Sequence, residues 1–106
     1  MKIKKASDNI FADLGFERPE EEAAKVDLAY EIASILKARK LTQVKASSLL
    51  QISQADVSKL VNVRPHGFSL DRLIAILTRL ERDVEIRVTK PSGAKRAGRV
   101  RAVLAA

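Results

Sequence analysis

The sequence contains no cysteine and only one histidine, His66. Without cysteine the chain cannot form a disulfide, a thiolate nucleophile or a cysteine-based zinc or iron–sulfur site. One histidine cannot supply a metal cluster, and no nucleophile–base pair can be assembled from the sequence. We therefore expect no enzyme, no metal site and no cofactor.

Aromatic residues and long apolar runs are also scarce. Aromatics make up 4% of the 106 residues, so the core of this single small domain must be aliphatic. The longest aliphatic run, Leu73 to Leu77, is far shorter than the ~20 residues that cross a bilayer. Asp8 and Asn9 interrupt any apolar signal-peptide region near the N-terminus. These absences favour a soluble cytoplasmic domain without membrane contact.

Positive charge is abundant but unevenly distributed, within a formal net charge of +7. Residues 1–36 carry five cations and eight anions, whereas residues 37–64 carry six cations against Asp56 alone. Residues 65–106 add nine cations and four anions. The acidic first third and basic remainder indicate two faces, and the basic face either meets a polyanion such as nucleic acid or simply solubilises the surface.

Capping residues and apolar spacing predict four helices. Pro19 suits the first turn of a long helix at about 19–40, with acidic residues at its start and basic residues at its end. Three shorter helices, each with a hydroxyl side chain that can cap it, are expected at 43–50, 54–61 and from residue 70 onward, after Thr42, Ser53 and Ser69.

After the fourth helix, apolar residues recur at every second position. Val84, Ile86 and Val88 alternate with charged residues, which predicts a short strand. Residues 89–101 contain five cations and no anion, a composition that cannot build a core. We therefore divide the chain into an N-terminal arm (1–18), a helical domain with a terminal strand (19–88) and a basic flexible tail (89–106).

The most specific feature is the pair of short helices joined by Gln51, Ile52 and Ser53. A helix-turn-helix needs a small residue at the point where its two helices touch. It also needs apolar residues that hold the second helix at a fixed angle. Ser47 can be the small residue, and the apolar positions are Ala46, Leu50, Ile52, Val57 and Leu60. Side chains short or polar enough to reach base edges lie on the outer face of the second helix at Gln54, Ala55, Ser58 and Lys59.

These helices resemble the XRE family of Cro/repressor-type helix-turn-helix proteins, in the stretches Leu41 to Gln43, Leu50 to Gln54 and Val57 to Leu60. Outside them, Ser7 to Phe16, Gly67 to Leu70 and Arg82 to Ile86 are similar to the HigA-like antitoxin branch, so the resemblance covers about residues 7–88. With the strand pattern, it implies a mainly α, four- to five-helix lambda-repressor-like helix-turn-helix domain with a short C-terminal β-strand.

The resemblance also implies roles for individual residues. Gln43 would bind phosphate, and Gln54 would read a base, typically adenine. Where the family usually has glycine in the turn, this chain has Gln51, which must accept a left-handed or nearby conformation at a cost of ~1 kcal/mol. Lys45 replaces the glutamate of a capping box and can contact a phosphate. Asp56 either weakens phosphate attraction or selects a cytosine amino group.

The expected DNA-binding set follows from these positions. Asn62 and Arg64, after the second helix, are either phosphate contacts or a solvated loop. The full set is Thr42, Gln43, Lys45, Ser53, Gln54, Ala55, Asp56, Ser58, Lys59, Asn62 and Arg64.

Two functions are compatible with this sequence. The first is a repressor that binds a double-stranded operator, and the alternative is an antitoxin that neutralises a cognate RNase-type toxin by direct binding and regulates its own operon. A lone strand leaves backbone groups unpaired, so either residues 2–4 or a second copy must pair with Val84, Ile86 and Val88. The second copy is the stronger expectation, because a homodimer would read an inverted-repeat operator.

Overall fold

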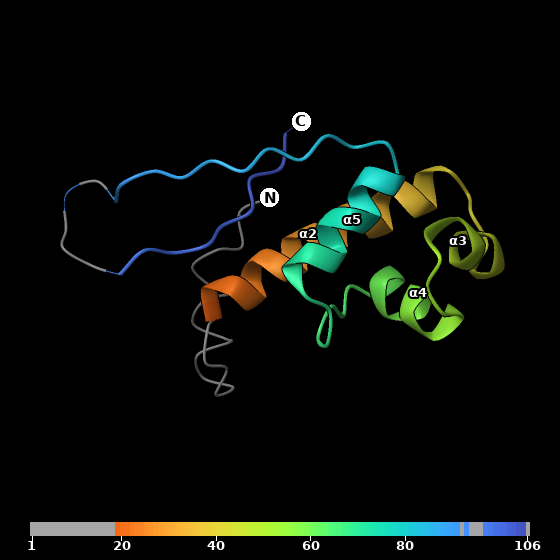
Figure 1. Cartoon of the computed structure of the whole chain (residues 1–106). Coiled ribbons are helices and arrows are strands. Elements are labelled where there is room, and N and C mark those ends of the chain that lie inside the picture. Colours follow the sequence, from red (N-terminus) through yellow and green to blue (C-terminus); the bar gives the residue numbers. More distant parts are fainter. Residues whose placement is uncertain (1–18, 92, 94–96, 106) are drawn as a thin grey trace.

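A computed structural model describes residues 19–91, 93 and 97–105, so the expected N-terminal arm lies outside the described residues. Four helices occur in the described part, and Figure 1 shows α2 and α5 side by side with α3 and α4 at one end of the pair. They are α2 (Pro19–Ala38), α3 (Gln43–Leu50), α4 (Gln54–Val61) and α5 (Leu70–Arg79). The four helices are confirmed, with α2 ending two residues before the expected bound.

Each of the three shorter helices begins at a hydroxyl side chain. The side-chain oxygens of Thr42, Ser53 and Ser69 accept the backbone N–H three residues later, at 3.1, 3.0 and 3.1 Å. Each contact satisfies one of the N–H groups that a helix start leaves unpaired. The expected caps are therefore confirmed, and they fix where the two helices of the motif begin.

Each helix is followed by a residue in the left-handed region that is not glycine. The φ angles are 55° at Lys40, 56° at Gln51, 54° at Val63 and 63° at Glu81. This conformation reverses the chain at a helix end, and glycine usually supplies it because an L side chain crowds its own backbone there. The expectation for Gln51 is confirmed, and three further positions share the strain.

The core is aliphatic around one aromatic ring, that of Phe68, which is 2% exposed. All four helices contribute to one buried cluster, and Leu80 closes it just after α5. The cluster comprises Ala29, Ile32, Ile35, Leu36, Ala46, Leu50, Val57, Leu60, Phe68, Leu73, Ile76, Leu77 and Leu80. Its composition confirms the expected aliphatic core. Both helices of the motif pack against this one cluster.

The strand predicted at Val84, Ile86 and Val88 is not confirmed. The structure assigns no strand in its described residues, and Figure 1 shows the chain after α5 turning back above the helices and then extending past them. Ile86 is 79% exposed and Val88 90%, whereas Val84 packs against the core. Alternation predicts an extended backbone, but a strand also needs a neighbouring backbone to pair with. No such pairing is assigned to these residues in the described chain.

Residues 97–105 return toward the helices (Figure 1). Val100, Ala102 and Leu104 are half-buried, and residues 99–102 line a shallow hollow with Ala23 and Ala24 of α2. The mobility expected of the tail stays a prediction. Its C-terminal part nevertheless contacts the first half of α2, which the composition did not indicate.

Candidate nucleic-acid interface

The turn between α3 and α4 is built around Ser47. The backbone N–H groups of Gln51 and Ile52 both donate to the Ser47 carbonyl, the second at 3.2 Å. The Ser47 hydroxyl in turn donates to the Ile52 carbonyl. Because one small residue takes part in all three contacts, α3 and α4 meet at a fixed angle, as a helix-turn-helix requires.

The inner side of the motif is apolar and fully packed. Ala46 and Leu50 of α3, and Val57 and Leu60 of α4, are each at most 2% exposed. Arg79 of α5 donates to the Leu50 carbonyl at 3.4 Å, which satisfies a backbone group at the end of α3. The packing of these inner side chains thus fixes the orientation of α4, with its outer face toward solvent.

The outer face of α4 carries the expected base-reading side chains. Gln54, Ala55 and Lys59 are exposed and Ser58 is half-buried. Ser53 is exposed at the start of the helix, with its hydroxyl oxygen engaged as the cap. A single exposed face therefore combines amide, methyl, hydroxyl and ammonium groups, the types that read base edges in the major groove.

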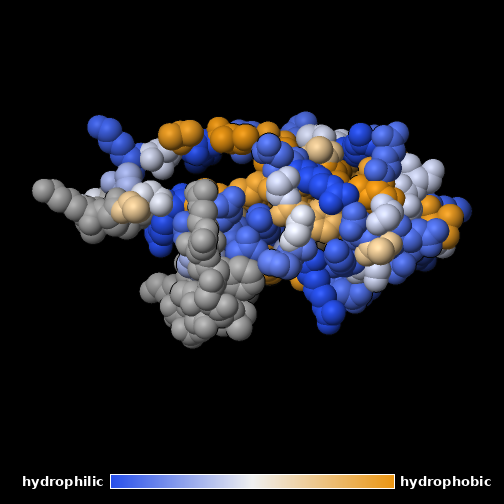
Figure 2. Space-filling view, turned by 60° about the horizontal axis from the view of Figure 1, so that its bottom comes forward, coloured by the Kyte–Doolittle hydropathy of each residue, from blue (hydrophilic) through white to orange (hydrophobic). Residues whose placement is uncertain are grey.

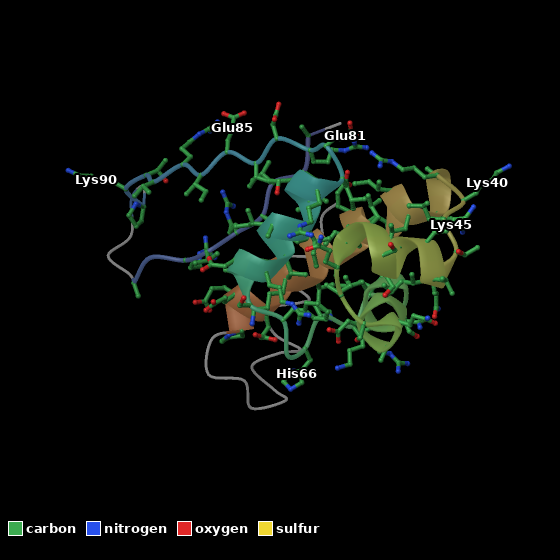
Figure 3. The ribbon with its side chains drawn as sticks, turned by 45° about the vertical axis from the view of Figure 1, so that its right-hand side comes forward. Lys40, Lys45, His66, Glu81, Glu85 and Lys90 are labelled. Carbon is green, nitrogen blue, oxygen red and sulfur yellow. The ribbon has the colours of Figure 1, made fainter. Side chains whose placement is uncertain are left out.

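The start of α3 adds a second group of exposed polar residues. Thr42, Gln43 and Lys45 are all exposed. In Figure 3, Lys45 and Lys40 both extend outward at the end of the molecule that α3 forms. An exposed helix start with nearby ammonium groups attracts phosphate, because its N–H groups and its dipole are both positive there.

Asp56 does not face outward as a free anion. Its carboxylate contacts the Arg72 guanidinium at 2.7 Å and the Lys59 ammonium at 3.9 Å, and its side chain is 20% exposed. Arg72 also lies over the Phe68 ring, 4.6 Å from the centroid. Sequence reasoning missed Arg72, because no local pattern links it to a residue 16 positions earlier.

Asn62 and Arg64, the last two residues of the expected DNA-binding set, follow α4 and make different contacts. The Asn62 side-chain amide donates to the Ser58 carbonyl at 2.9 Å and so closes the helix end. Arg64 is exposed, and its backbone N–H donates to the Lys59 carbonyl at 2.8 Å. One N–H of the Asn62 amide is thus used at the helix end, whereas the Arg64 side chain is exposed.

Neither a metal site nor a membrane-spanning helix occurs in the part of the chain that the structure describes. No group of three or more histidine, cysteine, aspartate or glutamate side chains in that part could hold a metal ion. None of its helices has the length and apolar character needed to cross a membrane.

Comparisons with known proteins agree with this geometry. A family described as a helix-turn-helix domain matches residues 10–89. A solved structure named "Putative XRE Family Transcriptional Regulator" superposes with a TM-score of 0.72 at 37% sequence identity, covering 81% of this chain and 97% of that chain. A search of curated proteins gave no match.

Proposed function

The chain belongs to the helix-turn-helix domain family, in its XRE branch, and from this premise we propose that it is a transcriptional repressor that binds a specific double-stranded operator. The observation that carries the proposal is the arrangement of α4. Its inner side chains Val57 and Leu60 are fully buried, while its outer face is polar and exposed. A rigidly held helix with such a face fits the major groove of B-DNA.

Sequence would be read from the first two turns of α4. The Gln54 amide can donate to and accept from adenine, and Ala55 can contact a thymine methyl group. Ser58 and Lys59 lie one turn further along, toward guanine or phosphate oxygens. Phosphates would be bound on either side of the groove by Thr42, Gln43, Lys45 and Ser53 at the helix starts and by Asn62 and Arg64 after α4.

The proposal includes a homodimer on an inverted repeat. Ile86 and Val88 are apolar, extended and almost fully exposed, at 79% and 90%. Antiparallel pairing of the segment containing Val84, Ile86 and Val88 with the same segment of a second copy would cover these side chains and satisfy the backbone groups. Two recognition helices related in this way would fit half-sites about 34–36 Å apart.

The test is selection of bound sites from random duplex DNA, followed by a pair of matched glutamine substitutions. Gln54→Ala should relax the preference at one base pair in each half-site, by about tenfold or more. Gln43→Ala removes the same side chain from the start of α3 and should weaken binding to every duplex about equally. Unchanged preferences in Gln54→Ala, or selection that enriches no sequence, would contradict the proposal.

The antitoxin alternative gains no support from the described residues. The N-terminal arm, residues 1–18, lies outside them, and the name of the similar structure refers to transcriptional regulation. Neutralisation of a toxin therefore stays a prediction from the resemblance alone.

A further inference from the structure

The first three residues of α4 have no buried apolar side chain. The helix has eight residues, and its buried side chains, Val57 and Leu60, are the fourth and seventh of them. Gln54 and Ala55 precede them and are exposed. A helix this short is marginal in isolation, because so few backbone bonds offset the cost of nucleation. A contact from another helix would add to the anchoring by Val57 and Leu60 and would restrict the angle of the base-reading turn further.

Asp56 provides that contact through Arg72. The carboxylate oxygen Oδ2 lies 2.7 Å from a guanidinium nitrogen of Arg72, which stands in the first turn of α5. Arg72 is itself held from below, since its guanidinium lies 4.6 Å from the centroid of the buried Phe68 ring. The contacts therefore run from the core ring, through one planar guanidinium, to the first turn of α4.

The second carboxylate oxygen of Asp56 also faces a cation. Oδ1 lies 3.9 Å from the Lys59 ammonium on the next turn of α4. To turn outward and bind a cytosine amino group, Asp56, whose side chain is 20% exposed, would have to exchange its contact with Arg72 for one with the base. That exchange would also bring an uncompensated anion close to the phosphates.

We propose that Asp56 and Arg72 are a positioning pair, which fixes the angle of the recognition helix against α5, and that Asp56 reads no base. The inference rests on the proposed function, because it assigns these two residues a role in reading the operator. It also explains why an acidic residue is compatible with a surface that binds a polyanion: the carboxylate is neutralised by the protein's own cations.

The test uses Asp56→Ala, Arg72→Ala and the double variant against a panel of operators with single base-pair changes. Each single variant should bind the operator about fivefold more weakly. In each, the preferences at all base pairs contacted by α4 should weaken at the same time. The double variant should be no weaker than either single one, because both remove the same contact. Asp71→Ala, an exposed acid in the first turn of α5 with the same change in net charge, should keep all preferences.

Thermal unfolding is measured first, and binding is compared at a temperature where every variant is folded. A purely structural role would lower the melting temperature and leave the preferences intact at that temperature, which would overturn the proposal. Loss of preference at one base pair in Asp56→Ala, with Arg72→Ala like the wild type, would identify Asp56 as a base reader and overturn it too. If the wild type shows no selective binding, the proposed function fails, and the positioning role fails with it.

Discussion

Backbone strain at the centre of the motif can be released by a single substitution. Gln51 ends α3 with φ 56° and ψ 46°, and its N–H donates to the Ser47 carbonyl. Its side chain is exposed, so removing it sacrifices no packing. Gln51→Gly therefore changes the backbone energy and little else, which makes it a clean probe of the left-handed turn.

The magnitude is the difference between two opposing effects. An L residue in this region costs about 1–2 kcal/mol, which glycine avoids. Glycine in turn loses about 0.4–1 kcal/mol more conformational free energy on folding. The net gain for Gln51→Gly should be about 0.5–1 kcal/mol, which for a domain of this size raises the melting temperature by about 2–6 °C.

The assay is thermal and urea unfolding followed by circular dichroism, with two comparisons. Gln51→Ala keeps the β-carbon and should give no gain. Val63→Gly relieves the same strain at φ 54°, but Val63 packs against the core, so lost burial of about 1 kcal/mol should cancel the benefit. Equal stabilisation by Gln51→Ala and Gln51→Gly would refute the reasoning, since the gain would not then come from the backbone.

Further predictions concern the core, the dimer and the phosphates. Leu60→Ala empties a fully buried position beneath α4, so we expect a loss of about 2–4 kcal/mol in the free energy of unfolding, measured by urea titration. Ile86→Pro removes a backbone donor from the proposed pairing segment, and sedimentation should then find a monomer that binds the full operator more weakly. If each protomer binds phosphate through Lys45, Lys59 and Arg64, the logarithm of operator affinity should fall with the logarithm of salt concentration with a slope of about −5. A slope near −10 or near zero would exclude that set of contacts.

The helix-turn-helix could be predicted from the sequence because its determinants are local. A hydroxyl side chain three residues before the N–H that it accepts is visible in the sequence, and this spacing located Thr42, Ser53 and Ser69. The left-handed turn at Gln51 was implied by the family resemblance, since the family usually has glycine at that position. Apolar spacing identified Leu50, together with the other buried positions of the motif.

The remaining features depend on segments far apart in the chain. Asp56 had two open interpretations in the sequence, and its contact with Arg72, 16 residues later, was not among them. Likewise, alternation at Val84 to Val88 indicates an extended segment but not whether a neighbour pairs with it, and in the described chain no strand forms. Local patterns specify conformations, whereas pairing depends on what the rest of the fold brings close.

The number of charged residues is likewise visible in the sequence, whereas the partners of each charge depend on the fold. A net charge of +7 suggests a large surplus for phosphates, yet several guanidinium groups contact carbonyl or carboxylate groups of the protein itself. Arg39 donates to the Leu80 carbonyl at 2.8 Å, and Arg79 donates to the Leu50 carbonyl at 3.4 Å, so both neutralise the negative ends of helices. Arg72 is paired with Asp56. Because these cations already have partners, the charge that meets DNA is a local property of the α3 and α4 surface, and net charge overstates it.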